Sequence, residues 1–323
     1  MKILSGAAIA AMLILGAGTA SAATYTLRLG SVLAPSDPLQ VAAEGFKKSV
    51  EERSNGEIEV QLFPSSQLGD TQDMMDQAQT GANIGTFVES SRVSVHVPQF
   101  NVMIAPYAFD NVEQLVRFTG TDLFKSWEEE LTAKTGLVLL SYNWYQGPRE
   151  MLTKKPIATP ADLAGQRIRT IGEPLWIETV TAMGGVPTPM AFAEVYPSLQ
   201  TGALDGAEVQ PAAIWGAKLH EVVTDITLTD HIFLMSGLIV SDAWLKSLPE
   251  DMQTIVWEEA DRWGASALKA NVEGAEKIWN DIRATGVNVT TIDTAPFKEA
   301  VQPVYEKLGL TDLVSQVRAA VAE

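Results

Sequence analysis

The sequence contains no cysteine, only three histidines and no run rich in lysine or arginine. Without cysteine the chain has no disulfide framework and no thiol chemistry. Its 40 acidic residues outnumber 23 basic ones, which gives a formal net charge of −17. Such a charge repels phosphate backbones, so we expect no nucleic-acid partner. Hydrophobic residues make up 46% of the 323 positions, which is enough for a buried core in roughly two domains.

The sequence motifs of common enzyme classes are missing as well. There is no HExxH zinc motif, no GxSxG nucleophile turn, no Walker loop and no GxGxxG. Gly184 and Gly185 follow a predicted helix rather than a strand, so we interpret them as the end of that helix and not as a phosphate loop. We therefore predict a protein that is not an enzyme and that has no metal site and no cofactor.

The first 22 residues have the pattern of a secretory signal peptide. Lys2 precedes an apolar run over residues 3–17, and Ala20-Ser21-Ala22 matches a cleavage site. The apolar run is shorter than the roughly 20 residues that cross a bilayer. We expect cleavage near Ala22/Ala23, export to a bacterial periplasm and no membrane insertion of the mature chain.

Segments with strand and helix patterns alternate through the rest of the chain. Strands are predicted at residues 25–30, 58–63, 136–142, 166–169, 205–209 and 231–241. Helices are predicted at residues 38–55, 70–81, 174–183, 192–200 and about 249–285. The last of these would be ~54 Å long at 1.5 Å per residue, longer than one domain, so we expect it to span both lobes. The alternation favours an α/β fold with helices packed on sheets.

Two segments indicate that the chain passes between lobes. Large aromatic and turn-forming residues at 143–148 predict one crossover, and the second falls near residue 231. We expect lobe I to contain residues 23–146 and about 232–270, and lobe II to contain residues 147–231 and about 271–323. Short crossovers of this kind suit a hinge.

Three arginines in apolar or turn-rich surroundings are candidates for anion binding. Arg169 lies near the carboxyl end of a predicted strand, where α/β sheets place their ligands. A guanidinium group holds a carboxylate through two parallel hydrogen bonds. Arg149 and Arg92 are similar candidates. On spacing alone, an ion pair with one of the 40 acids explains each arginine equally well.

Aromatic residues near the predicted crossovers and strand ends point to the type of ligand. The side chains concerned are those of Trp144, Tyr145, Trp176 and Trp215. Flat aromatic faces suit the C–H faces of sugars, although core packing is the commoner role for any single one of them. Together with Glu89 and Gln210 as partners for hydroxyl groups, they favour a polyhydroxylated acid over a small dicarboxylate.

Five short motifs together resemble one known family. They are PSSQLGD at 64–70, which ends in Asp70, IRT at 168–170, GVPTPM at 185–190, EVYPSLQTG at 194–202, and LDGAE at 204–208, which ends in Glu208. In this order, over essentially the whole mature chain, they resemble the DctP-type solute-binding proteins of tripartite ATP-independent periplasmic (TRAP) transporters.

The resemblance implies a two-lobed clamp that binds an organic acid between its lobes by hinge closure. The clamp would deliver the acid to the membrane permease subunits of a TRAP transporter. By the same resemblance, Arg169 forms the ion pair with the ligand carboxylate, Arg149 is a second basic contact, and Phe192 packs on the ligand.

Glu89 and Arg92 lie in the stretch FVESSR, which resembles the FxESxR stretch of sialic-acid-binding members. Those members carry an asparagine soon after the Asp-Gly pair, where this chain has Val209 or Gln210, and the difference argues against sialic acid. Asp70, Glu208, Gln210 and Trp144 complete the predicted ligand contacts. The expected ligand is a sugar acid. The alternatives are a smaller keto acid or a dicarboxylate, a sensing role for a receptor, and a secreted enzyme that acts on sugar acids.

Overall fold

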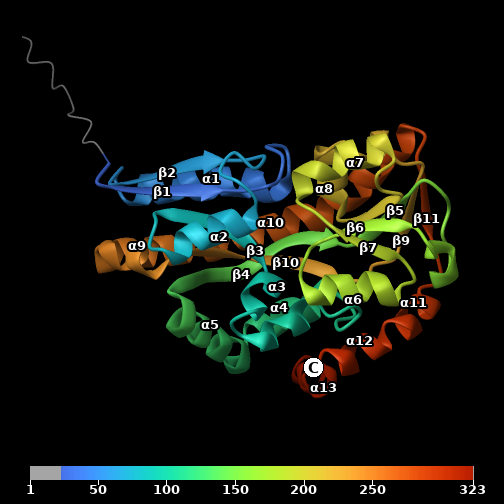
Figure 1. Ribbon diagram of the computed structural model, residues 1–323. Coiled ribbons are helices and arrows are strands. Elements are labelled where there is room, and N and C mark those ends of the chain that lie inside the picture. The colour runs from blue at the N-terminus through green and yellow to red at the C-terminus, as the bar shows by residue number, and fades with distance from the viewer. Residues whose placement is uncertain (1–22, 323) are drawn as a thin grey trace, which may run out of the picture.

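Two β-sheets with helices on their faces make up the computed structural model, which describes residues 23–322 (Figure 1). The predicted signal peptide, residues 1–22, lies outside the described residues. The two sheets and their helices confirm the predicted α/β class, and the arrangement is that of a two-lobed clamp.

The first sheet has the strand order β2-β1-β3-β10-β4. Its strands are β1 (Tyr25–Gly30), β2 (Ile58–Phe63), β3 (Ile84–Glu89), β4 (Leu137–Pro148) and β10 (Phe233–Ser241). Strands β1, β2 and β3 are parallel, while β10 runs antiparallel to both β3 and β4. The carboxyl ends of the three parallel strands therefore lie at one edge of this sheet.

The second sheet has the order β11-β9-β5-β8-β6-β7. Its strands are β5 (Glu150–Thr153), β6 (Arg167–Thr170), β7 (Val186–Pro189), β8 (Gly206–Val209), β9 (Asp225–Leu228) and β11 (Asn288–Thr291). Strand β6 runs parallel to β7 and β8. The chain passes between the sheets from β4 to β5 and from β9 to β10. The assignment of all residues to two lobes stays a prediction.

Helices cover both sheets. They are α1 (Pro38–Arg53), α2 (Thr71–Gln79), α3 (Ser90–Ser94), α4 (Val112–Thr119), α5 (Asp122–Thr135), α6 (Pro174–Ala182), α7 (Val195–Thr201), α8 (Pro211–Gly216), α9 (Asp242–Ser247), α10 (Glu250–Ala284), α11 (Ala295–Ala300), α12 (Gln302–Lys307) and α13 (Thr311–Ala320). The glycine after α6, Gly184, has φ +97° and ends the helix, as the sequence predicts.

The segment at 143–148, where the sequence predicts a crossover between the lobes, is the second half of strand β4. It pairs with β10 as far as Pro148, through a ladder with several register shifts, and Gly147 adopts φ +114° at one of them. An edge strand tolerates a proline and a glycine where a bulge or a missing donor breaks the ladder. The chain crosses to the second sheet only at Arg149.

Helix α10 spans both lobes, as predicted. Its 35 residues correspond to about 52 Å. It packs on β4 and α1 of the first lobe and on α8 and β11 of the second, and it runs behind both sheets in Figure 1. A single rigid element thus connects the two lobes in addition to the strand crossovers.

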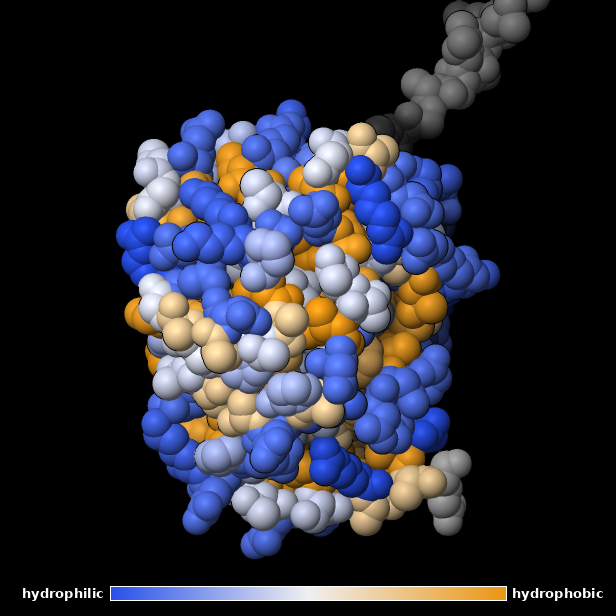
Figure 2. All heavy atoms as spheres, turned by 90° about the vertical axis from the view of Figure 1, so that its right-hand side faces the viewer, coloured by the Kyte–Doolittle hydropathy of each residue, from blue (hydrophilic) through white to orange (hydrophobic). Residues whose placement is uncertain are grey.

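No helix among residues 23–322 is both long enough and apolar enough to cross a membrane. Figure 2 shows the face beside the second sheet, where hydrophilic residues are widespread and apolar residues form small patches between them.

Candidate functional site

A cavity of about 280 Å³ lies between the two sheets, at the carboxyl ends of parallel strands from both. The lining residues from the first sheet and its helices include Leu33, Asp70, Glu89, Arg92 and Gln146, and those from the second include Arg149, Arg169, Glu173, Met190, Phe192 and Gln210. Seven of the nine predicted contacts therefore lie on one cavity.

Arg169 presents a buried cation to this cavity. Strand β6 places Ile168 in the core and leaves 4% of Arg169 exposed. The Nε and Nη2 atoms of Arg169 donate to the Met190 carbonyl oxygen at 3.2 and 3.0 Å, and the guanidinium carbon lies 5.7 Å from the centre of the Phe192 ring. Within residues 23–322 no carboxylate oxygen lies within 4.0 Å of Arg169. Burial, followed by the opposing effects of Glu208 and Arg149, lowers the pKa of Arg169 to about 10, so it remains cationic at neutral pH.

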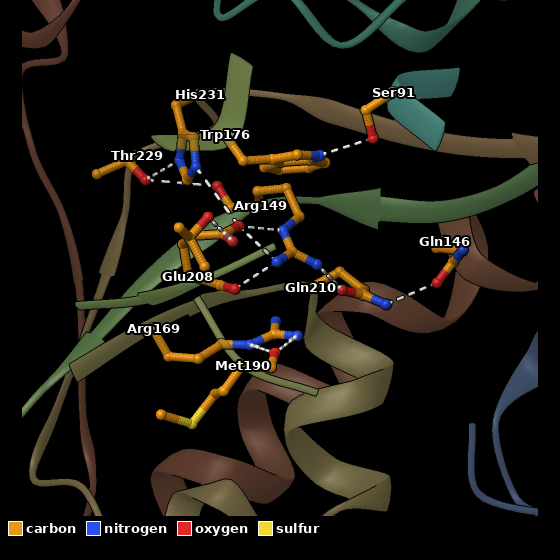
Figure 3. A network of polar contacts seen from close by, with 11 residues as sticks. Ser91, Gln146, Arg149, Arg169, Trp176, Met190, Glu208, Gln210, Thr229 and His231 are labelled. Atoms are coloured by element: carbon orange, nitrogen blue, oxygen red, sulfur yellow. Dashed lines mark hydrogen bonds and ion pairs between the residues drawn. The ribbon is translucent and has the colours of Figure 1, made fainter. Parts of the chain in front are cut away.

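Arg149, by contrast, has its charge balanced inside the protein (Figure 3). Its Nε donates to Glu208 Oε2 and its Nη1 to Gln210 Oε1, both at 2.5 Å, and Nη2 donates to the Glu208 carbonyl oxygen. The Trp176 ring lies 5.1 Å from the guanidinium carbon. Gln210 in turn donates to Gln146 at 2.7 Å, so amides from both sheets hold Arg149 in place.

Arg92 is paired across the cleft. Its Nε donates to Glu89 Oε2 at 3.0 Å, and its Nη1 lies 3.2 Å from Glu173 Oε1, at the start of α6. Burial lowers the pKa of Arg92, but the charges of Glu89 and Glu173 outweigh this effect and leave it raised. Asp70 caps α2 by accepting from the Asp73 backbone N–H at 3.0 Å. The spare carboxylate oxygens of Asp70 and Glu89 can therefore accept hydrogen bonds from a ligand.

Two predicted contacts do not line the cavity. Trp144 is fully buried in the core, where its ring packs 4.7 Å from that of Phe87 and its Nε1 donates to Ser141. Glu208 is also fully buried, behind Arg149, and accepts from Thr170 at 2.8 Å.

Sequence reasoning missed eleven of the eighteen residues that line the cavity, among them Gln146, Glu173 and Met190. Gln146 falls in the segment that was predicted as a crossover, and Met190 contributes a backbone carbonyl that leaves no signal in the sequence. Glu173 could have been recognised from the sequence, because it directly precedes Pro174 at the predicted start of a helix. Among residues 23–322 no three side chains of His, Cys, Asp or Glu cluster as metal ligands would.

Comparison with known proteins identifies the family. The sequence model of the DctP family, described as bacterial extracellular solute-binding protein, family 7, matches residues 29–312. The sialic acid-binding periplasmic protein SiaP of Vibrio cholerae is 29% identical over 95% of both chains.

Solved structures of TRAP periplasmic solute-binding proteins show the same fold. The protein from Actinobacillus succinogenes with bound L-galactonate is 29% identical, has a TM-score of 0.89, and the match covers 92% of this chain and 99% of that one. An apo, open structure from Escherichia fergusonii is 41% identical, with the same coverage and a TM-score of 0.81. The structure thus superimposes better on the ligand-bound relative than on the apo, open one, despite the lower sequence identity. The chain belongs to family 7 of the bacterial extracellular solute-binding proteins, the DctP family, whose members bind solutes for transporters and are not enzymes.

Proposed function

We propose that this protein captures a six-carbon sugar acid in the periplasm and delivers it to the permease subunits of a TRAP transporter. The observation that carries the proposal is the state of Arg169, a buried cation that faces the cavity without a carboxylate partner among residues 23–322. A buried charge with no partner is unfavourable by several kcal/mol. A ligand carboxylate would supply that partner through two parallel hydrogen bonds.

The other lining residues support a polyhydroxylated acid. The carboxylates of Asp70 and Glu89 would accept hydrogen bonds from ligand hydroxyl groups, and the ring of Phe192 would pack against C–H groups. The volume of about 280 Å³ is just below the roughly 300–1,000 Å³ usual for ligand pockets, which favours a compact solute. The proposal assigns no direct ligand contact to Trp144 or Glu208.

Export and domain closure are part of the same proposal. Cleavage near Ala22/Ala23 would release the mature chain into the periplasm, and mass spectrometry of the secreted protein tests this site. The two predicted lobes, residues 23–146 with about 232–270 and residues 147–231 with about 271–323, would close on the ligand.

Thermal unfolding against a panel of acids tests the proposed ligand class. The panel contains aldonates, hexuronates, sialic acid, keto acids and C4 dicarboxylates, added to protein that has been refolded to remove any bound solute. A ligand at 1,000 times its Kd adds ~4 kcal/mol to the free energy of unfolding, and at ~2–4 °C per kcal/mol it raises Tm by about 10 °C.

The variant Arg169→Ala should lose this rise in Tm. Arg167→Ala is the matched control, because Arg167 lies two residues earlier on the same strand, is exposed, and pairs with Asp205 at 2.9 Å. A rise in Tm with keto acids or C4 dicarboxylates alone would contradict the sugar-acid assignment. A rise that survives in Arg169→Ala would contradict the role of this arginine.

A further inference from the structure

The charges around the cavity are unequally compensated. Three arginines line it, and each has a different environment. Arg92 is paired with Glu89 and Glu173 on opposite sides of the cleft. Arg149 and Glu208 form a pair whose side chains are 3% and 0% exposed. Arg169 alone has no carboxylate within 4.0 Å among residues 23–322, so it is the arginine whose charge is available to a ligand.

Glu208 and Gln210 together engage three of the hydrogen-bond donors of Arg149. A guanidinium group has five N–H donors. The Glu208 carboxylate and carbonyl oxygen engage Nε and Nη2, and Gln210 engages one N–H of Nη1. Two N–H groups of Arg149, one on Nη1 and one on Nη2, make no hydrogen bond within residues 23–322, but the positive charge of Arg149 is already balanced.

The His231 ring on the other side of Glu208 is not a second cation. The Nε2 atom of His231 lies 4.0 Å from Glu208 Oε2, and the His231 ring is fully buried. Burial, and then the charge of Arg149, lowers the pKa of His231 to about 3, so this ring is neutral at pH 7. Arg149, Arg169 and Glu208 together therefore carry one net positive charge.

We propose that Glu208 determines the charge of the acid that the site accepts: by neutralising Arg149, it makes the cavity selective for acids with one carboxylate and excludes diacids. This inference rests on the proposed function. Glu208 is a positioning residue, since it acts on the ligand through Arg149. The second carboxylate of a diacid would lose its water without meeting an uncompensated cation, and Asp70 and Glu89 would repel it.

Isothermal titration calorimetry with two matched pairs of acids tests the inference. The pairs are L-galactonate with galactarate and D-glucuronate with glucarate; galactarate and glucarate each carry a second carboxylate on the same six-carbon chain. An opposite charge close to an ionised group stabilises it by about one to three tenfold steps. The wild-type protein should therefore bind each diacid at least about tenfold more weakly than its monoacid.

Glu208→Gln should reverse this preference. Without the carboxylate, Arg149 becomes a second uncompensated cation, so the ratio of diacid to monoacid affinity should rise by about tenfold or more. Glu208→Asp keeps the charge and should keep the monoacid preference. The matched control is Glu259→Gln on α10, because Glu259 is also a buried carboxylate between two arginines, Arg53 and Arg262, but lies outside the cavity lining. This control should leave the affinity ratio unchanged.

The outcomes separate this inference from the proposed function. If the wild type binds a monoacid and its diacid equally well, or if Glu208→Gln leaves the ratio unchanged, the role of Glu208 is overturned and sugar-acid binding stands. If the wild type binds neither acid of either pair, the proposed function fails and the inference falls with it. If Glu208→Gln does not fold, the diacid-to-monoacid affinity ratios of the wild type and of Glu208→Asp still test the inference. A preference for the diacid in either protein contradicts it.

Discussion

Asp37 is a buried carboxyl group whose ionisation opposes folding. It caps α1 by accepting from the Leu39 backbone N–H at 2.9 Å, and 3% of it is exposed. Burial, partly offset by this hydrogen bond, raises the pKa of Asp37 from 3.8 to about 6. The folded protein thus holds this proton more tightly than the unfolded chain does. The stability contributed by Asp37 is fully present below about pH 4 and is lost as the pH rises to about 6.

Asp37→Asn should therefore stabilise the protein at neutral pH. Asparagine keeps an acceptor for Leu39 and removes the charge, so the gain should be up to about 3 kcal/mol at pH 7.5 and should vanish near pH 4. Urea unfolding at several pH values measures it. Asp205→Asn is the control and should destabilise the protein at neutral pH. Hydrogen bonds from Arg167 lower the pKa of Asp205 to about 2, so its charged form favours folding. A gain that is independent of pH would contradict the assignment to Asp37.

The sequence alone does not distinguish the roles of the three arginines in the cavity. Arg92, Arg149 and Arg169 look equivalent in the sequence, because each fits either an ion pair or an anion receptor. The structure separates them through distant partners: Glu208 is 59 positions from Arg149 along the chain. Pairing of this kind depends on the tertiary fold and leaves no local pattern. Only the position of Arg169 at a strand end, together with the family motifs, singled it out.

Helices and strands differ in how far sequence predicts them. The start of α1 follows from Asp37 and Pro38, which are local signals, and that helix begins where predicted. The second half of β4 was missed because its pairing with β10 joins residues such as Trp144 and Ser236, far apart in the chain. The helix-forming composition of α10 predicted its length, but not which of its residues touch β4.

Two glycines in α10 should respond in opposite ways to alanine. A Cβ atom on Gly264 would lie 1.7 Å from Asn143 Oδ1 on β4, whereas one on Gly274 would meet no atom within 4 Å. Gly274→Ala should stabilise the protein by about 1 kcal/mol, the usual helix preference for alanine. Gly264→Ala should destabilise it by about 1–3 kcal/mol, since the Asn143 side chain must move and lose its hydrogen bonds to Asp261. Thermal unfolding of the two variants compares them directly, and a stabilised Gly264→Ala would show that α10 packs less closely on β4.

At the scale of the whole molecule, contacts between protein groups hold the cleft closed on one side. Helix α3 of the first lobe meets the start of α6 in the second. Arg92 pairs with Glu173 there at 3.2 Å, and the Trp176 indole donates to Ser91 at 2.9 Å. These bonds exist only when the lobes are together, so they favour closure independently of any ligand. The motifs predicted a clamp with a hinge, but Glu173 as part of its closing contact was not predicted.

Glu173→Gln should shift the ligand-free protein toward the open state. The Arg92 and Glu173 side chains are 14% and 15% exposed, so we expect the loss of their ion pair to change closure by about 1 kcal/mol, roughly fivefold in the open-to-closed ratio. Small-angle scattering should show a larger radius of gyration without ligand and recovery of the compact value with saturating ligand, and ligand release should become faster. Glu178→Gln, on the helix that Glu173 precedes but paired with Lys307 away from the cavity, should change neither quantity. If Glu173→Gln weakens binding without any change in the ligand-free radius of gyration, Glu173 acts on the ligand itself and not on closure.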